Sequence, residues 1–212
     1  MRFPRPVLSL ITDRRQLGGV GSLAGFAARA ARAGVTLIQV RERDLSDREV
    51  LALARDIVNA TSGSAAAILV NDRTDIALAA GAAGVHLRSD SAAASRVRAI
   101  VPASFVVGRS VHSVEEALAV ERDGGVDYLV FGTVFESASK PGLPAAGLPA
   151  LEEMCRRVRL PVLAIGGVTP ARAAGVAAAG AAGVAGIGMF VEAGNSGGLA
   201  PLVATLQRAF DT

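Results

Sequence analysis

The 212-residue sequence has one cysteine, one tyrosine, two histidines and no tryptophan. Cys155 has no second cysteine for an internal disulfide, and no nearby histidine would complete a metal site with it. We expect this thiol to pack within a helix over 148–158. Because there is almost no aromatic surface on which bases could stack, nucleic-acid binding is not expected.

Long hydrophobic runs are absent as well. Hydrophobic residues make up 51% of the chain, yet no run approaches the roughly 18 apolar residues that a membrane span needs. Residues 1–6 carry cations but lead into no signal-peptide core. We therefore expect a cytoplasmic protein without membrane partners. The formal net charge of +3 is small and its basic residues are scattered, a balance that suits small anionic ligands.

Glycine is plentiful, and two apolar runs end in it: AIGGVTP at 164–170 and GVAGIGM at 183–189. Glycine lets the backbone approach a ligand closely, and N–H groups at the start of a helix favour an anion. Two such turns late in an α/β chain predict a phosphate cradle, as after strands seven and eight of a (β/α)₈ barrel. Its residues are Gly166, Gly167, Gly188 and Met189.

Short apolar runs alternate with amphipathic segments such as 46–60 and 113–123, as expected of parallel strands covered on both faces. A helix-ending glycine followed by a strand recurs along the chain, which indicates a repeated βα unit. We therefore expect one (β/α)₈ TIM-barrel domain over residues 1–212. The predicted strands are 7–12, 35–40, 66–70, 84–87, 105–108, 127–131, 161–165 and 183–187.

Polar side chains gather where the predicted strands end, which is where a barrel carries its chemistry. They are Asp13, Gln39, Arg41, Arg43, Asn71, Asp72, His86, Arg88, Asp90, Ser110, His112, Ser137, Ser139 and Lys140. The strand bodies are apolar. The pattern therefore predicts a polar site at one end of the barrel.

The first group of these residues allows two interpretations. Residues 39, 41 and 43 share one side of a strand because side chains alternate. Arg41 and Arg43 could then clamp a phosphate or diphosphate beside Gln39. The alternative is a surface salt-bridge run with Glu42 and Asp44.

The middle strands carry similar alternatives. Asn71 and Asp72 suit either a divalent cation or the cap of the next helix. His86 suits a structural hydrogen bond or a site role. His112 shares a side with Ser110 if the strand extends that far, and is either a proton carrier or part of a helix cap.

The connection over 132–147 is rich in serine, proline and glycine. Ser137, Ser139 and Lys140 offer two hydroxyls and an ammonium, which suit phosphate oxygens. Such a composition is typical of a lid, and the alternative is a plain surface loop.

Several motifs stand in a specific order: LITDR (10–14), QVRER (39–43), NDR (71–73), GVHL (84–87), FGTVF (131–135), SK (139–140) and AIGG (164–167). Together they resemble the thiamine phosphate synthase family over nearly the whole chain. This (β/α)₈ family also includes the TenI-like thiazole tautomerases.

For a synthase, the resemblance implies that an aminopyrimidine diphosphate ionises to a pyrimidine cation and diphosphate. The ring nitrogen of a thiazole phosphate then captures the cation, in chemistry that depends mostly on electrostatics. The resemblance places diphosphate against Gln39, Arg41, Arg43, Asn71, Ser110 and Lys140, and thiazole phosphate against Ser137, Ser139, Gly167, Gly188 and Met189. Asp72 would serve both diphosphate and Mg²⁺.

The sequence departs from the synthase pattern after strand four. Synthases typically follow His-Leu with Gly-Gln and an acidic residue that completes the Mg²⁺ site. Here Asp90 stands one residue early and Ser91 occupies the usual ligand position. A guanidinium at Arg88 would oppose Mg²⁺ or take its place.

The run 108–117 and the FGTVF motif are closer to TenI-like tautomerases, which isomerise a carboxylated thiazole phosphate without a metal. Because the catalytic histidine of that group falls where this chain has Thr133, the base would be His112, Lys140 or an acidic residue. The catalytic candidates are His112, Lys140 and Ser110, the last because the resemblance to synthases gives it a role in stabilising the departing anion. Tautomerase-type proton transfer is our leading interpretation. The alternatives are a synthase whose Mg²⁺ is held by Asp72 and Asp90, and a non-catalytic phosphate-ligand binder. Each takes a small phosphorylated heterocycle, and a homodimer is one expectation because barrels of this family often pair.

Overall fold

The computed structural model describes residues 5–17, 20–136, 142 and 144–211. Eight parallel strands close into a barrel in chain order, with β8 paired back to β1. The strands are β1 (Val7–Ile11), β2 (Leu37–Val40), β3 (Ala67–Asn71), β4 (Gly84–Leu87), β5 (Val106–Val111), β6 (Tyr128–Phe131), β7 (Val162–Ala164) and β8 (Gly183–Gly186). The expected (β/α)₈ fold is confirmed.

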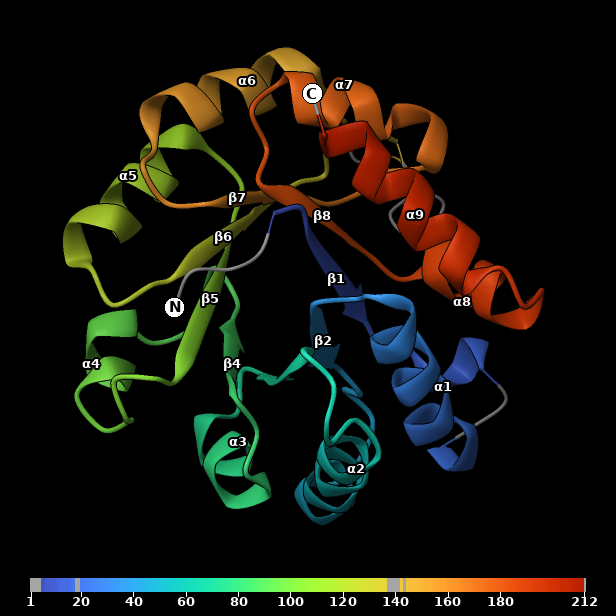
Figure 1. Ribbon diagram of the computed structural model, residues 1–212. Helices are drawn as coiled ribbons and strands as arrows, with labels where there is room; N and C mark the ends of the chain where they lie inside the picture. The colour runs from blue at the N-terminus through green and yellow to red at the C-terminus, as the bar shows by residue number, and fades with distance from the viewer. Residues whose placement is uncertain (1–4, 18–19, 137–141, 143, 212) are drawn as a thin grey trace.

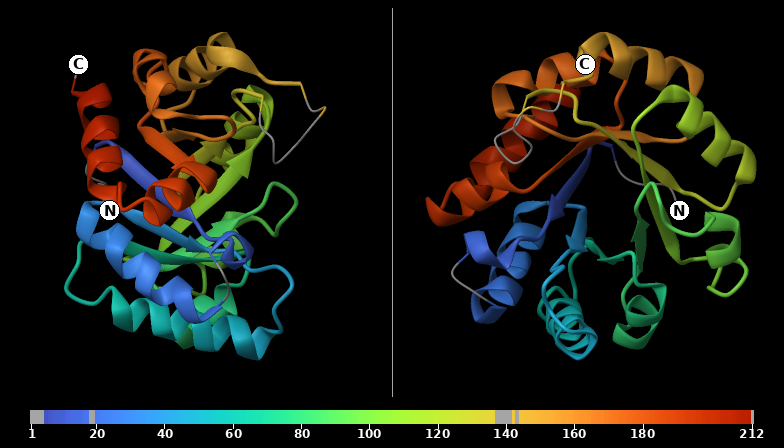
Figure 2. Two further views of the ribbon diagram at one scale, coloured as in Figure 1. Left: turned by 90° about the vertical axis from the view of Figure 1, so that its right-hand side faces the viewer. Right: turned by 180° about the vertical axis from the view of Figure 1, so that it is seen from behind.

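Helices form a ring around the strands (Figure 1). They are α1 (Val20–Ala33), α2 (Asp47–Ala60), α3 (Thr74–Ala80), α4 (Ala94–Arg98), α5 (Val114–Asp123), α6 (Gly147–Arg157), α7 (Ala173–Ala178), α8 (Gly188–Asn195) and α9 (Leu199–Phe210), with single 3₁₀ turns at Arg14–Gln16 and Pro170–Arg172. The connections after β2 and β6 project from the same end of the barrel (Figure 2, left). No helix within the described residues is long and apolar enough to cross a membrane.

Local sequence explains where the helices begin and end. At the start of α2 the backbone N–H of Ser46 donates to the Glu49 carboxylate at 2.8 Å. At the start of α5 the Ser113 hydroxyl accepts from the N–H of Glu116 at 3.1 Å. These bonds satisfy N–H groups that have no partner inside the helix. The helices predicted over 46–60 and 113–123 are therefore confirmed, with their first residues acting as caps.

Two apolar clusters fill the molecule, one between the strands and the helices and one inside the barrel. Leu37, Leu69, Val106, Tyr128, Val130 and Leu163 belong to the inner cluster. Side chains alternate along each strand, so the next inward positions toward the carboxyl ends are polar: Gln39, Asn71, His86 and Ser110. The inner core thus ends beneath a polar mouth.

Strand β5 is longer than the apolar run predicts, since it continues past Gly108 to Val111. Arg109 and Ser110 remain in the strand because the Arg109 terminal nitrogens and the Ser110 hydroxyl find partners inside the molecule, while Arg109 Nε is buried without a partner among the described residues. The Arg109 guanidinium donates to the backbone oxygen of Ala92 at 2.8 Å, and Ser110 Oγ lies 2.9 Å from His86 Nε2. Prediction from apolar runs stops at the first polar residue and so misses this extension.

Candidate active site at the barrel mouth

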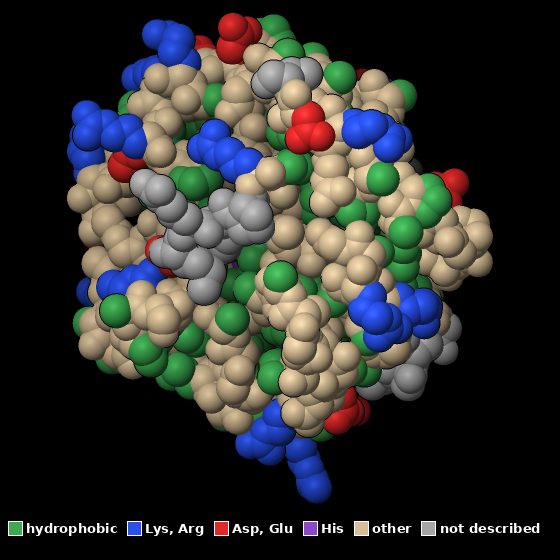
Figure 3. Space-filling view, viewed as in Figure 1, with side chains coloured by type: hydrophobic (Ala, Val, Ile, Leu, Met, Phe, Trp, Pro, Cys, Tyr) green, Lys and Arg blue, Asp and Glu red, His purple; other side chains and the backbone are tan. Residues whose placement is uncertain are grey.

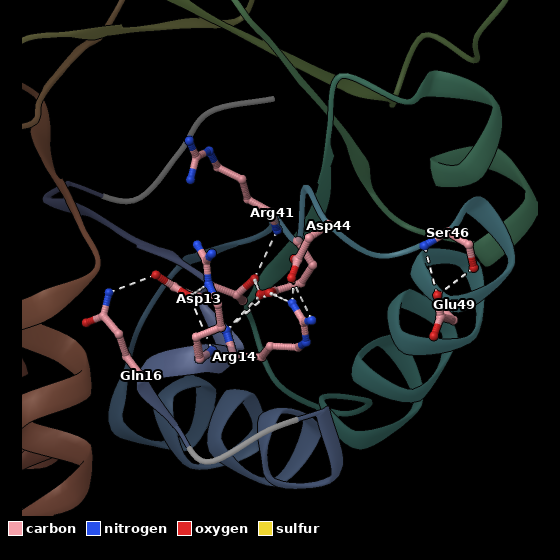
Figure 4. A network of polar contacts seen from close by, with 10 residues as sticks. Asp13, Arg14, Gln16, Arg41, Asp44, Ser46 and Glu49 are labelled. Carbon is pink, nitrogen blue, oxygen red and sulfur yellow. Dashed lines mark hydrogen bonds and ion pairs between the residues drawn. The ribbon is translucent and has the colours of Figure 1, made fainter.

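A buried carboxylate joins the ends of β1 and β2. Glu42, whose side chain is 2% exposed, accepts a hydrogen bond from the Thr12 hydroxyl at 2.7 Å. It also accepts from the Arg14 backbone N–H at 3.1 and 3.2 Å and from Arg14 Nη1 at 3.3 Å. The same Arg14 guanidinium donates to both oxygens of Asp44, at 2.6 and 2.8 Å. Figure 4 shows this network.

Arg41 and Arg43 flank this network: the Arg41 backbone N–H donates to Thr12 Oγ1 at 2.9 Å, but neither guanidinium pairs with the acidic residues of the network. Their acidic neighbours are held by Arg14, so the surface salt-bridge alternative is wrong. In the part of the chain that the structure describes, neither guanidinium has a carboxylate within ion-pair distance. The Arg41 side chain turns away from the network (Figure 4).

Burial lowers the pKa of the Arg41 guanidinium, and the neighbouring charge of Arg43 lowers this pKa further. An arginine nevertheless stays protonated near neutral pH. The mouth therefore contains two positive charges without acidic partners.

The inward polar residues are connected in pairs. Gln39 Nε2 donates to Asn71 Oδ1 at 3.0 Å. His86 is 3% exposed, and its ring nitrogens lie 2.9 Å from the Tyr128 hydroxyl and 2.9 Å from Ser110 Oγ. Burial, followed by the charge of Arg41, lowers the pKa of His86 to about 4. The imidazole is therefore neutral near pH 7, where it holds the Ser110 hydroxyl rather than carrying a proton.

His112 lies just beyond β5 and is exposed. Its Nδ1 is 2.8 Å from the backbone oxygen of Gly132, and its backbone N–H donates to Glu116 at 2.8 Å. Because a carbonyl oxygen only accepts, Nδ1 carries a hydrogen in this contact. Ser110 bonds to His86, so the structure does not pair it with His112. The other candidates on the 132–147 connection, Ser137, Ser139 and Lys140, lie outside the described residues.

The glycines after β7 are closely surrounded by the connection that follows β6. Gly166 and Gly167 have φ of 94° and 61°. A Cβ on Gly166 would lie 2.5 Å from Thr133 Cγ2, and one on Gly167 would lie 2.3 Å from the backbone oxygen of Glu136. The connection after β6 therefore requires these glycines, whether or not a ligand approaches them.

The start of α8 is open by comparison. A Cβ on Gly188 would meet no atom of the described residues within 4 Å. Among the described residues, the N–H groups of Gly188 and Met189 donate to no backbone oxygen. Free N–H groups at a helix start favour an anion. Strands β7 and β8 are hydrogen-bonded neighbours, so this helix start lies beside the turn at Gly166 and Gly167.

The two carboxylates expected to hold Mg²⁺ face one guanidinium. Arg88 Nη2 lies 2.5 Å from Asp90 and Nη1 lies 3.9 Å from Asp72 Oδ2. The Ser91 hydroxyl donates to the other oxygen of Asp72, and Asp72 has an uncommon positive φ of 61°. Mg²⁺ needs near-octahedral oxygen ligands at about 2.0–2.1 Å. With a guanidinium between the carboxylates, the residues as arranged do not fit this ion.

Arg109 is a residue whose role the sequence did not reveal. Its buried guanidinium donates to the backbone oxygens of Ser89 and Ser91 at 2.8 and 3.0 Å, besides its bond to Ala92. It therefore anchors the connection that carries Arg88 and Asp90. The only signal in the sequence is a charge inside an otherwise apolar strand.

A hollow of about 370 Å³ opens at the carboxyl ends of β2 and β3. Val40, Val50 and Ile76 form part of its apolar wall. Its polar lining includes Arg43, Arg73, Arg88, Asn71 and Asp72. Residues predicted to act together from three strand ends thus border one space.

Comparison with known proteins gives a consistent result. A family model described as thiamine monophosphate synthase matches residues 8–190. The chain is 42% identical to a thiamine-phosphate synthase of Roseiflexus castenholzii over 82% of this chain and 77% of that one. It is 40% identical to a thiamine-phosphate synthase of Methanoculleus marisnigri over 80% of each. Among solved structures, a thiamine phosphate pyrophosphorylase from Pyrococcus furiosus superposes with a TM-score of 0.81 at 30% identity, over 97% of this chain and 96% of that one.

Proposed function

We propose that this chain, which belongs to the thiamine monophosphate synthase family, joins an aminopyrimidine diphosphate to a thiazole phosphate, forming thiamine phosphate and diphosphate. The relatives from Roseiflexus castenholzii and Methanoculleus marisnigri are both named thiamine-phosphate synthases. They support this alternative better than the tautomerase interpretation that led our sequence analysis.

The observation that carries the proposal is the pair of cations at the barrel mouth. As the carbon–oxygen bond to diphosphate breaks, negative charge develops on the leaving group. Fixed cations stabilise such charge without reorganising at the moment of reaction. Arg14 neutralises Glu42 and Asp44, so the charges of Arg41 and Arg43 remain available for the diphosphate.

The bonding changes need no proton carrier. The breaking carbon–oxygen bond leaves its electron pair on diphosphate and produces a pyrimidine methylene cation. The lone pair of the thiazole nitrogen then forms the new carbon–nitrogen bond and leaves a thiazolium. A buried His86 that is neutral near pH 7, with Ser110 hydrogen-bonded to it, fits such a reaction. In our proposal these groups orient the substrates, as do the amides of Gln39 and Asn71.

The phosphate of the thiazole would lie at the other side of the mouth. This assignment is supported by the N–H groups of Gly188 and Met189, which donate to no backbone oxygen of the described residues, and by the turn at Gly166 and Gly167 on the neighbouring strand. This assignment separates the two anions: diphosphate lies over β2 and β3, and the monophosphate lies over β7 and β8. The reacting carbon and nitrogen would then meet between them.

Product formation tests the proposal. Purified protein is incubated with aminopyrimidine diphosphate and aromatic thiazole phosphate, once with Mg²⁺ and once with a chelator. We expect thiamine phosphate and diphosphate in equal amounts in at least one condition. The non-aromatic thiazole isomer is supplied alone in a parallel reaction. If that isomer is converted to the aromatic form and the first reaction yields no thiamine phosphate, the protein is a tautomerase and not a synthase. If thiazole phosphate binds saturably and neither product forms, the protein is a non-catalytic binder.

A further inference from the structure

The hollow beside β2 and β3 is lined by arginines besides the one that the proposed function assigns to diphosphate. Arg43, Arg73 and Arg88 all line it. Arg73 is engaged, because its guanidinium pairs with Asp47 and with Asp75. Arg43 has no carboxylate within ion-pair distance in the described ranges. Arg88 occupies the place between two carboxylates where a cation is needed.

The position of Arg88 resembles that of a bound ion. Its two terminal nitrogens are directed to different acidic side chains, Asp90 at 2.5 Å and Asp72 at 3.9 Å. Its side chain is 46% exposed, so the guanidinium also remains accessible from the hollow. A ligand there can reach it without breaking into the core. A guanidinium offers five N–H donors in a planar fork that matches phosphate oxygens.

Hydrogen bonds hold the backbone of the connection that carries Arg88. The N–H of Arg88 donates to Ser91 Oγ at 2.8 Å, and the Ser91 hydroxyl donates to Asp72. Arg109 binds the backbone oxygens of Ser89, Ser91 and Ala92 from below. The short connection after β4 is thus tied both to β3 and to β5. The backbone of Arg88 therefore lies in a connection that is held by hydrogen bonds on both sides.

We propose that Arg88 is the resident cation of this hollow, so that the chain binds a diphosphate group there without a divalent metal ion. The inference rests on the proposed function, since it concerns the diphosphate subsite of the same reaction. The two carboxylates would position Arg88 instead of ligating Mg²⁺. Together with Arg43, Arg88 would supply the positive charge that a metal would otherwise supply.

Calorimetric titration with inorganic pyrophosphate tests this directly. Wild-type protein and Arg88→Gln are each titrated in chelator and in Mg²⁺, with correction for the Mg²⁺–pyrophosphate complex formed in solution. Wild type should bind in chelator, and Mg²⁺ should not strengthen binding. Arg88→Gln should weaken metal-free binding about tenfold or more, the scale of a charge-assisted hydrogen bond. Arg73→Gln, a change in the same wall, should have a much smaller effect because Asp47 and Asp75 already hold that side chain.

The variant gives a second readout. Removing the guanidinium frees Asp72 and Asp90, so Mg²⁺ should strengthen pyrophosphate binding to Arg88→Gln more than to wild type.

Wild-type binding that requires Mg²⁺, or metal-free binding unaffected by Arg88→Gln, would overturn the inference. Product formation that requires Mg²⁺ would also overturn it while leaving the synthase proposal intact. Arg88-dependent, metal-free pyrophosphate binding without product formation would support it and count against the synthase.

Discussion

Individual buried residues determine which positive charges at the barrel mouth are free to bind an anionic ligand. Glu42 is the main example, since its carboxylate accepts from the Thr12 hydroxyl and from Arg14. If it were absent, Arg14 would lose its buried partner, and the ends of β1 and β2 would lose a shared acceptor. The charge of Arg41 is therefore available because Arg14 holds the neighbouring carboxylates, and Arg14 need not touch the substrate.

Replacing Glu42 by glutamine should destabilise the protein by about 1.5–3 kcal/mol, because the Thr12 hydroxyl and the Arg14 N–H groups lose a buried charged acceptor, although Arg14 keeps its pair with Asp44. Asp44→Asn is the matched control. Asp44 binds the same Arg14, but its side chain is 47% exposed, so its loss should cost about 1 kcal/mol or less. Urea unfolding of both variants measures the difference. Equal losses would mean that burial of Glu42 is not the deciding factor.

His86 should make the stability of the protein depend on pH. Its pKa is lowered from 6.5 to about 4 in the folded chain, so between these values the unfolded chain binds a proton that the folded chain does not. The free energy of unfolding should therefore rise with pH in this window, and on acidification the contribution lost is up to about 3 kcal/mol.

Unfolding free energies measured from pH 4 to 7 check the contribution of His86. His86→Gln should reduce the slope between pH 4 and 6.5 relative to wild type. His112→Gln changes the other histidine of the sequence, which is exposed, and should leave the slope close to that of wild type. A slope that persists in His86→Gln would assign the effect to other groups.

At the scale of elements, the turns after β7 and β8 look alike in sequence and differ in structure. Gly167 is enclosed by Glu136 and Phe135, with a Cβ position 2.3 Å from a backbone oxygen. Gly188 opens to free space at the start of α8. Both were expected to contact phosphate; among the described residues the second has more room, and phosphate contact stays a prediction for both.

Alanine substitutions separate the two turns. Gly167→Ala should destabilise the protein by about 2 kcal/mol or more, because a left-handed alanine is strained and its methyl group would collide with the backbone. Gly188→Ala should stay within about 0.5 kcal/mol of wild type. Thermal or urea unfolding compares them. Equal tolerance at both positions would contradict the packing of the β6 connection against β7.

The connection after β4 depends on β5 in the same way. Arg109→Lys keeps the charge but cannot reach three backbone oxygens at once. We expect faster amide hydrogen exchange over residues 88–92 and unchanged exchange in β1. Arg96→Lys on the exposed face of α4 is the control. Protection over 88–92 that matches wild type would show that Arg109 does not hold this connection.

The elements themselves could largely be read from the sequence. Strand β4 has the predicted bounds, and α2 and α5 begin one residue after their predicted starts because Ser46 and Ser113 are caps. The extension of β5 could not be predicted, since it depends on the partner that Ser110 finds on β4 and on those that Arg109 finds in the connection after β4.

At the scale of the whole molecule, closure of the barrel decides which residues meet. The pairing of Arg14 with Glu42 spans 28 positions and depends on the register that places Ile11 beside Gln39. Sequence alone placed Arg41 and Arg43 at the mouth, but could not show that Arg14 would take their acidic neighbours. Arg88 is similar: the sequence placed it beside the expected metal ligands, and the fold places it between them.

The surface agrees with a small anionic ligand rather than a large polyanion. On the face shown in Figure 3, arginine side chains lie in several separate groups instead of one continuous patch. The charge that matters for the proposed function is concentrated in the mouth. The cytoplasmic location and the homodimer stay predictions.

The most direct test measures thiamine phosphate formed from aminopyrimidine diphosphate and thiazole phosphate by wild type, Arg41→Gln and Arg122→Gln. Arg122 is an exposed residue near the end of α5 and serves as the matched loss of charge. We expect product from wild type and from Arg122→Gln, and kcat/KM at least about tenfold lower for Arg41→Gln, because a cation that stabilises the leaving group is lost. Absence of thiamine phosphate from wild type, with and without Mg²⁺, would contradict the account.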